Sequence, residues 1–420
     1  MENPDYLTRD EAIDALRIKP ATLYAYVSRG LLRRVKDQGG RRSLYLREDV
    51  NRLKARHAGH PARTEAASQA LRWGEPVVDT GITLIDTAGP SYRGRAASEL
   101  ARSGASFEAV AHLLLTGLWQ PGIESWPGIH TPADARHTIT ADMKAVKPHE
   151  LSHTCARAVL ALGMGQRGAA ELAGDGSQAA RLIIQTLAGC LGYLGKGPGF
   201  TARRANEPVA RQILRACGRQ PDLQAESAVN QVLIVLADHE LATASFVARV
   251  AASTHSDLYC CIAAALCAHA GSSTLAATCA VDERLFGPLS AHNWTAMQRL
   301  ARERGAALFG FNHPLYARGD PRADYILALV AQLPPTGRKI RELLRFVDEA
   351  RTQSAVTPGI AAALAVFARV LGMPPGAAAA LWIISRTAGW TAHALEQRMQ
   401  GYLLRPRARY VARGLGKGGS

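Results

Sequence analysis

The chain has 420 residues, of which 47% are hydrophobic and 20% are charged, and its formal net charge is +15. This length exceeds one compact core of ordinary size, so we expect two or three domains, and the large apolar fraction excludes general disorder. The positive charge favours an acidic partner such as nucleic acid, a phosphorylated cofactor or a carboxylate substrate, without choosing among them.

Seven cysteines occur without a CxxC pair or a metal-ligand spacing. We therefore expect reduced, buried thiols in a cytoplasmic protein that binds no metal. Residues 1–5 are polar and lack the features of a signal peptide. The longest uncharged stretch, residues 260–281, is interrupted by Gly271-Ser272-Ser273-Thr274. This pattern predicts a buried helix followed by a loop, and no membrane partner.

The first 57 residues carry the signals of a small separate domain. Thr8 and Glu11 form a capping box at the start of a helix, and Pro20 suits the first turn of a second helix that ends at Gly30. A tight turn at residues 38–40, a short strand with alternating Leu44 and Leu46, and a third helix from residue 48 follow. The pattern predicts a winged helix-turn-helix over 1–57, followed by a linker over 58–75.

This segment is also strongly basic. Between Arg29 and Arg56 there are ten cationic side chains and three acidic ones. Cations of this density suit a phosphate backbone, because binding them releases condensed counterions. The candidate DNA-binding residues on the second helix and the wing are Thr22, Tyr24, Arg29, Arg41 and Arg42.

The combination of Leu7-Thr8-x-x-Glu11-Ala12, Thr22-Leu23-Tyr24-x-Tyr26-Val27-x-Arg29-Gly30-Leu31, Arg41-Arg42 and Glu48-Asp49-Val50 resembles the excisionase and MerR-type helix-turn-helix family. Lys19 stands where that family usually has a Ser or Thr cap. The resemblance implies binding to DNA. The alternative is a helix-turn-helix that contacts only proteins, because a fold does not fix a function.

Most of the remaining chain is alanine-rich with helical spacing, as in residues 107–115 and 361–371, and helix stop signals recur at Gly117, Gly271, Gly372 and Gly401. A strand-like segment covers residues 81–86. Residues 163–168 match GxGxxG but lack a βαβ setting, so we interpret them as a loop and not as a nucleotide site.

A series of short motifs then extends along the body. They are Tyr92-Arg93-Gly94, residues 107–117, Ala237-Asp238-His239-Glu240-Leu241, residues 248–254, Gly310-Phe311-Asn312-His313-Pro314-Leu315-Tyr316, Asp320-Pro321-Arg322-Ala323, Ser385-Arg386-Thr387-Ala388-Gly389-Trp390-x-Ala392-His393 and Arg405-Pro406-Arg407. In this order they resemble citrate synthases from about Val77 to Val411. The resemblance implies a mainly α fold, with a large domain over 76–275 and 375–420, a small domain over 276–374, and assembly as a homodimer.

The family condenses acetyl-CoA with oxaloacetate, and the resemblance implies roles for particular residues. His239 and His313 match catalytic histidines that contact the keto acid and polarise its carbonyl. Arg322, Arg386 and Arg405 match substrate-binding arginines, the last reaching the neighbouring subunit's site, and bidentate guanidinium groups suit carboxylates. Gly310 lies in a loop that meets CoA, which is thus a candidate ligand, and no covalently bound cofactor is implied. The alternative for the two histidines is a purely structural place in the core.

Two positions depart from the family pattern. Thr274 occupies the place of the histidine that hydrogen-bonds the enol of acetyl-CoA, and Ala361 occupies the place of the catalytic aspartate. A thioester methyl is a weak carbon acid, so its deprotonation needs a positioned carboxylate and a donor for the enolate. His269 is a candidate substitute for the donor, although its helical offset from residue 274 argues against this.

These observations predict a catalytically impaired, citrate-synthase-like regulator that binds oxaloacetate-like acids and CoA and conveys their presence to a DNA-binding domain. One alternative is an active citrate or 2-methylcitrate synthase, an acyltransferase, whose helix-turn-helix is a scaffold. Another is an enzyme of altered chemistry that uses the CoA cleft without enolisation.

Overall fold

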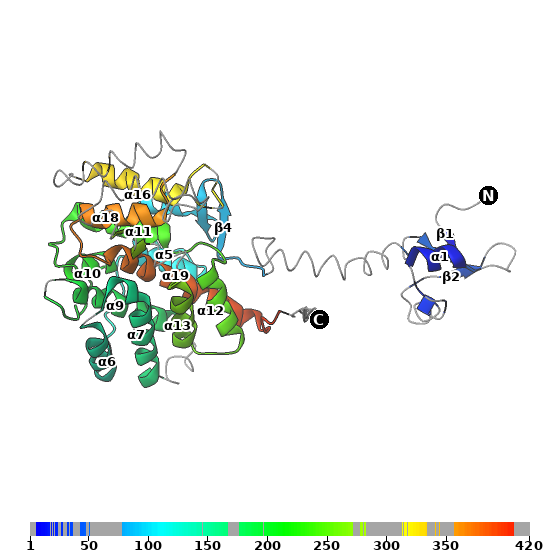
Figure 1. The fold of residues 1–420 in the computed structure, drawn as a ribbon, viewed down its shortest axis with the longest axis horizontal. Coiled ribbons are helices and arrows are strands. Elements are labelled where there is room, and N and C mark those ends of the chain that lie inside the picture. The colour runs from blue at the N-terminus through cyan, green and yellow to red at the C-terminus, as the bar shows by residue number, and fades with distance from the viewer. Residues whose placement is uncertain are drawn as a thin grey trace, which may run out of the picture. The chain divides into compact units, whose positions relative to one another are not determined.

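The computed structural model divides the chain into two compact units, residues 1–79 and 80–420, and each is described by itself (Figure 1). The structure describes residues 6–16, 18, 20, 22, 23, 27, 32, 34–36, 43–47, 50, 78–144, 146–166, 176–195, 197–271, 278, 279, 281, 282, 313, 315, 316, 318–333, 341, 344 and 357–406. The predicted linker lies outside these residues. So does most of the predicted small domain, and the division of the body into two domains stays a prediction.

The first unit contains one helix with defined bounds and a three-stranded antiparallel sheet in the order β1-β3-β2. Its elements are β1 (Tyr6–Thr8), α1 (Arg9–Leu16), β2 (Arg34–Lys36) and β3 (Ser43–Leu46). The predicted capping box is confirmed, because the Thr8 backbone N–H donates to Glu11 Oε2 at 2.7 Å. The predicted hairpin is also confirmed by the pairing of β2 with β3. The strand β1, which pairs with the far edge of β3, was not predicted.

The predicted short strand at Leu44 and Leu46 is confirmed as β3. Tyr45 is the fully buried residue of β3, whereas its neighbour Leu44 is only half-buried. The aromatic ring of Tyr45 therefore contributes to the core of this unit, which was not predicted. Positions 20, 22, 23 and 27 are helical, in agreement with a second helix, and so are positions 47 and 50. The core residues are Leu7, Ala12, Leu16, Leu23, Leu32, Tyr45 and Val50.

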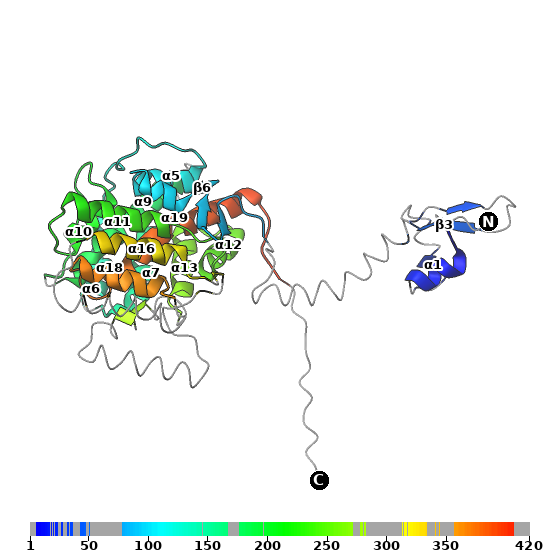
Figure 2. The same cartoon turned by 90° about the horizontal axis from the view of Figure 1, so that it is seen from above.

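The body is built from helices, as the sequence predicts (Figures 1 and 2). Its first helices are α4 (Ala97–Arg102), α5 (Phe107–Thr116), α6 (Ala133–Met143), η1 (Pro148–Glu150), α7 (Leu151–Gln166), α9 (Gly176–Cys190) and η2 (Leu191–Leu194). The later ones are α10 (Val209–Ala216), α11 (Leu223–Leu236), α12 (Thr243–Ser253), α13 (Leu258–His269), α16 (Pro321–Gln332), α18 (Ile360–Val370) and α19 (Ala377–Gln400). One hydrophobic core joins them.

Helix α19 organises this core. It packs against α5, α9, α11, α12, α13 and α18, and lies in the middle of the body in both views (Figures 1 and 2). Its small residues Ala377–Ala380 and Gly389 allow close approach, since a Cβ at Gly389 would lie 2.6 Å from the Ala237 carbonyl oxygen. The sequence between α11 and α12 is therefore held directly against the centre of α19. This contact places the Asp-His-Glu motif beside the Ser385–His393 motif.

A small antiparallel meander of β4 (Thr83–Asp86), β5 (Gly89–Tyr92) and β6 (Arg95–Ala96) precedes the helices. The predicted strand at residues 81–86 is thus confirmed in β4, whereas β5 and β6 were not predicted. The Tyr92 hydroxyl reaches the carbonyl oxygens of Ile234 and Val235 at 3.0 and 3.2 Å. The meander is therefore fastened to the end of α11, immediately before Asp238.

The GxGxxG segment differs from the prediction of a loop, because residues 163–166 continue α7. A Cβ at Gly163 would lie 2.8 Å from Tyr259 Cβ, so glycine permits the close packing of α7 against α13. The predicted helix stops at Gly117 and Gly401 are confirmed, with φ of 76° and 71°. Within the described residues, no helix is long and apolar enough to cross a membrane.

Candidate ligand-binding site

The first predicted arginine is fixed at the beginning of α16. Asp320 is the N-cap of this helix and accepts the backbone N–H of Arg322 at 3.0 Å. The same carboxylate accepts Nε and Nη2 of the Arg322 guanidinium at 3.0 and 2.7 Å. Burial opposes the ionised carboxylate, but Arg322 outweighs it and lowers the pKa of Asp320. The helix start and the ion pair together orient a guanidinium that is 4% exposed.

The second predicted arginine lies in the middle of α19. Arg386 donates from Nη2 to the Ser245 hydroxyl at 2.8 Å, and its Nη1 lies 3.3 Å from Asp238 Oδ1. Among the described residues, Nη1 has no hydrogen-bond partner although it is buried. An unused donor on a buried cation costs free energy. A ligand carboxylate is a group that would satisfy it.

Asp238 is the counter-ion of this region and is fully buried. Its Oδ2 accepts hydrogen bonds from the Thr83 hydroxyl at 2.6 Å and from the Glu240 backbone at 3.1 Å, and His393 Nε2 lies 3.1 Å away. Burial opposes ionisation, but His393, Arg386 and the hydrogen bonds lower the pKa of Asp238 to about 2. The carboxylate therefore stays charged and holds Arg386 in place.

Three rings complete the site. His239 and His313 pack edge-on with centroids 5.3 Å apart, and Tyr316 lies 5.8 Å from the first ring and 5.1 Å from the second. The Tyr316 hydroxyl is 2.9 Å from His239 Nε2. Burial, then the charges of Arg322 and Arg386, hold the pKa of His239 well below its ordinary value. Burial and Arg322 likewise lower the pKa of His313. Both rings are therefore neutral near pH 7.

The structure thus brings together four of the predicted site residues, which are His239, His313, Arg322 and Arg386. Their charges act on one another, since Arg322 and Arg386 both lower the pKa of His239. Arg405 is exposed and follows the end of α19. Gly310 and Thr274 lie outside the described residues, as do Tyr24, Arg29, Arg41 and Arg42 of the first unit, whereas Thr22 is half-buried in a helical position.

Ala361 is 6% exposed and lies in the first turn of α18, within the main core. Its methyl group has no capacity to accept a proton.

His269 packs edge-on against Trp382 and Trp390, with ring centroids 5.0 and 5.4 Å away. Burial and the charge of Arg386 lower the pKa of His269 to about 3. His269 is therefore a buried, neutral ring. The two tryptophans that it contacts lie on α19, about one helical turn before and one turn after Arg386.

Four residues of the site had no role assigned from the sequence. Tyr316, Asp320 and Asp238 stand inside the motifs quoted above, and their place in those motifs was the available signal. Ser245 carries no signal in the sequence, because only folding brings the start of α12 against α19. Within the described ranges, no group of three or more His, Cys, Asp or Glu side chains is arranged to hold a metal ion.

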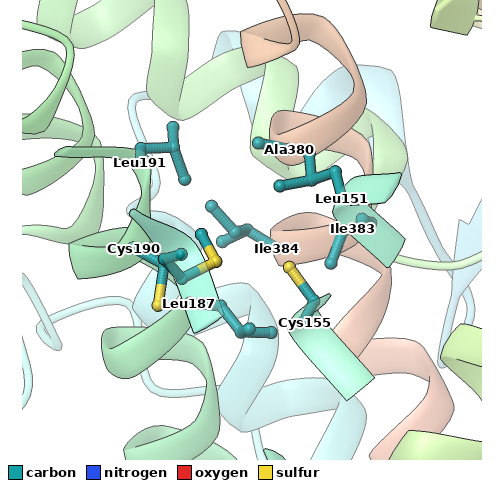
Figure 3. A pocket seen from close by; sticks show the side chains of 9 residues that line it. Leu151, Cys155, Leu187, Cys190, Leu191, Ala380, Ile383 and Ile384 are labelled. Carbon is teal, nitrogen blue, oxygen red and sulfur yellow. The ribbon is translucent and has the colours of Figure 1, made fainter. Parts of the chain in front are cut away.

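A separate cavity lies in the core between α6, α7, α9, η2 and α19 (Figure 3). Its volume is about 10 Å³, which is room for no more than one water molecule. Its lining is apolar apart from the thiols of Cys155 and Cys190, and none of the predicted site residues belongs to it. Burial raises the pKa of Cys155 to about 12, so this thiol stays protonated. Among the seven cysteines, none forms a disulfide.

Comparisons with known proteins agree with this arrangement. The family model of the citrate synthase C-terminal domain matches residues 70–407, and a helix-turn-helix domain model matches residues 6–58. The chain therefore belongs to the citrate synthase family and carries an N-terminal helix-turn-helix domain. The fold is also that of citrate synthase from Thermoplasma acidophilum (TM-score 0.67, 22% identity, covering 81% of this chain and 94% of that one) and from Pyrobaculum aerophilum (TM-score 0.66, 24% identity, covering 81% and 91%).

Curated relatives are similar over a shorter stretch. Citrate synthase 2 of Bacillus subtilis is 33% identical over 197 residues, which are 46% of this chain and 53% of that protein. The citrate/2-methylcitrate synthase of the same organism is 26% identical over 236 residues, covering 52% and 63%. The chain thus spans somewhat more than half the length of these curated relatives.

Proposed function

We propose that this protein is a ligand-responsive DNA-binding regulator, whose citrate-synthase-like body binds an oxaloacetate-like keto or dicarboxylic acid without condensing it. The proposal rests on the combination of a buried cluster of arginines and histidines with an alanine at the position that matches the family's catalytic aspartate. Arg386 Nη1 is a buried donor that pairs with the charge of Asp238 but has no hydrogen-bond partner among the described residues, and it lies near Arg322 and His239. The position that should hold the catalytic aspartate is Ala361, buried in α18.

The similarity in fold to a citrate synthase solved with its ligands supports a keto acid as the ligand. The Thermoplasma acidophilum citrate synthase was solved with oxaloacetate and carboxymethyl coenzyme A. At Arg322 and Arg386 this chain offers two guanidinium groups, which suit the carboxylates of such an acid. CoA is a second candidate ligand, and its proposed contact, Gly310, lies outside the described residues.

The proposal includes a homodimer. Arg405 is exposed in the single chain, and three apolar side chains that precede it in the sequence, Met399, Tyr402 and Leu403, are 77%, 45% and 56% exposed. Such apolar exposure next to a cation that is expected to enter a neighbour's site favours a second copy as the partner. A two-fold dimer would carry two helix-turn-helix domains, which suits an inverted-repeat DNA site.

The direct test combines DNA selection with ligand titration. Full-length protein is used to enrich random duplexes by gel shift, with and without oxaloacetate. We expect enrichment of an inverted repeat and a change of affinity on adding the acid. If the protein enriches no sequence and binds no more tightly than an equally basic control protein, the regulator proposal fails.

The second candidate is an active citrate or 2-methylcitrate synthase. It is favoured by membership of the family and by the names of the two Bacillus subtilis relatives. Calorimetry with oxaloacetate, citrate and acetyl-CoA, run beside an assay of thiol release, separates the two candidates. Binding without release supports the regulator, whereas rapid release supports the enzyme.

A further inference from the structure

Tyr316 contacts three of the groups proposed to bind the acid. Its hydroxyl meets His239 Nε2 at 2.9 Å, its ring lies 5.1 Å from the His313 ring, and the Arg322 guanidinium carbon lies 5.9 Å from its ring centre. Its side chain is 5% exposed. A residue in this position can orient its neighbours even if it never touches the ligand.

The direction of the hydrogen bond between Tyr316 and His239 follows from which of the two groups carries the proton. Burial raises the pKa of Tyr316 to about 12, so the phenol keeps its proton. Among the described residues, His239 Nε2 is the one partner of this hydroxyl. An unprotonated imidazole nitrogen is a stronger acceptor than a phenol oxygen, so the hydroxyl donates and Nε2 accepts. The ring proton of neutral His239 then resides on Nδ1.

The tautomer of His313 is the opposite of that of His239. The Leu315 backbone N–H donates to His313 Nδ1 at 3.2 Å, so the ring proton of neutral His313 resides on Nε2. Neither His239 Nδ1 nor His313 Nε2 has a hydrogen-bond partner within the described part of the chain. Two N–H groups from different rings are therefore left for a ligand.

We propose that Tyr316 is a positioning residue that locks the His239 tautomer, so that His239 and His313 each present a ring N–H to the acid and neither presents an acceptor nitrogen. The donors are His239 Nδ1–H, His313 Nε2–H and the Nη1 groups of Arg322 and Arg386. A keto acid matches this set, because its carbonyl and carboxylate oxygens only accept. A 2-hydroxy acid matches less well, because neither ring offers its hydroxyl hydrogen an acceptor nitrogen, and an unsatisfied buried polar group is costly. This inference rests on the proposed function.

The tautomer is measured directly on full-length protein labelled with ¹⁵N-histidine. The signals of His239 are assigned by their loss in His239→Gln. In the wild type we expect nitrogen shifts typical of a ring protonated at Nδ1, and in Tyr316→Phe a mixture of tautomers or a shift to Nε2. A wild-type His239 protonated at Nε2 overturns the proposal, and this result needs no ligand to bind.

The selectivity is measured by calorimetry with oxaloacetate and malate, which differ at the keto oxygen. The wild type should prefer oxaloacetate by at least about tenfold, and Tyr316→Phe should reduce the ratio to within about threefold. Tyr325→Phe, on α16, is the matched control, since its hydroxyl donates to Gln231 Oε1 at 2.6 Å and to neither histidine. In this variant the ratio should be unchanged. An unchanged ratio in Tyr316→Phe overturns the proposal. If the wild type binds neither acid, the proposed acid sensing fails, and the tautomer measurement still decides the role of Tyr316.

Discussion

Glu396 Oε1 accepts the backbone N–H of Gly81 at 2.9 Å, across 315 positions of sequence. The other oxygen of the same carboxylate accepts the Thr80 hydroxyl and Nη1 of Arg249, at 2.8 and 2.7 Å. The Arg249 side chain is fully buried and also donates to Gln397 and Gln400. The carboxylate of Glu396 thus links three segments by hydrogen bonds: the end of α19, the middle of α12 and the first residues of the body.

Removing that carboxylate should destabilise the body strongly. Glu396→Ala leaves a buried guanidinium without its charge partner, which costs about 3–5 kcal/mol. Denaturant unfolding of the purified protein measures the change. Glu226→Ala is the control, because it breaks the Arg211 ion pair, in which the arginine is 45% exposed, and it should cost no more than about 1 kcal/mol. Equal losses in both variants would contradict the importance of the buried cluster.

The stability should depend on pH through Asp238. Its pKa is lowered from 3.8 to about 2 in the fold, so its contribution is complete above pH 3.8 and is lost as the pH falls through 2. The shift corresponds to about 2–3 kcal/mol. We expect Asp238→Asn to be less stable than the wild type by about this amount at pH 7, with the difference shrinking below pH 4. Asp142→Asn, at an ion pair whose arginine, Arg157, is 68% exposed, should change stability by less than about 1 kcal/mol. A difference that is constant from pH 7 to pH 2.5 would disagree with the assignment.

Ligand affinity should require the guanidinium of Arg386 and not only its charge. A lysine at this position cannot contact Ser245 and Asp238 and also present a planar donor pair to a carboxylate. Arg386→Lys should therefore weaken oxaloacetate binding by about tenfold or more, as measured by calorimetry. Arg369→Lys, at the ion pair with Asp282 in which the arginine is 27% exposed, serves as the control and should bind like the wild type. Unchanged affinity in Arg386→Lys would remove this arginine from the site.

Condensation should be near background in the wild type. Thiol release from acetyl-CoA in the presence of oxaloacetate is the measurement, and turnover of about 1 s⁻¹ or faster would be ordinary catalysis and would refute this prediction. Restoring both groups, as Ala361→Asp with Thr274→His, should raise release at least about tenfold over the wild type, because a general base alone contributes about 10²–10⁴-fold. Ala361→Asn with Thr274→His lacks the base and should stay at background.

Binding to DNA should depend on the cations of the first unit. Replacing Arg41 and Arg42 by alanine should weaken binding to all sequences and reduce its salt dependence, because each contacted phosphate contributes about one released counterion. Changing Thr22 or Tyr24 should alter the preferred sequence instead. Replacing the exposed body residues Arg136 and Arg157 removes the same charge and should leave affinity unchanged. If the two double variants lose affinity equally, net charge alone explains binding.

Local signals in the sequence were enough for elements whose cause is local. The Thr8–Glu11 box, the helix at residues 107–116 and the glycine stops at 117 and 401 follow from hydrogen bonds and dihedral preferences within a few residues, and all are confirmed. The prediction of a loop at residues 163–166 was wrong, because these residues continue α7. A glycine stands at position 163 because Tyr259 on another helix leaves no room for a side chain there. The short strand at Leu44 and Leu46 is confirmed as β3, but the burial of Tyr45 on it was not predicted.

For the site, the sequence alone determined which chemical groups are present: two arginines and two histidines in ordered motifs, with alanine in place of an acid. Tertiary structure decided how these groups are held. Asp238 pairs with Arg386, Ser245 caps the same guanidinium, and Tyr316 meets His239, over separations of up to about 150 positions. Such contacts depend on how α19 packs against its neighbours, and packing is a property of the whole core, which no short pattern encodes.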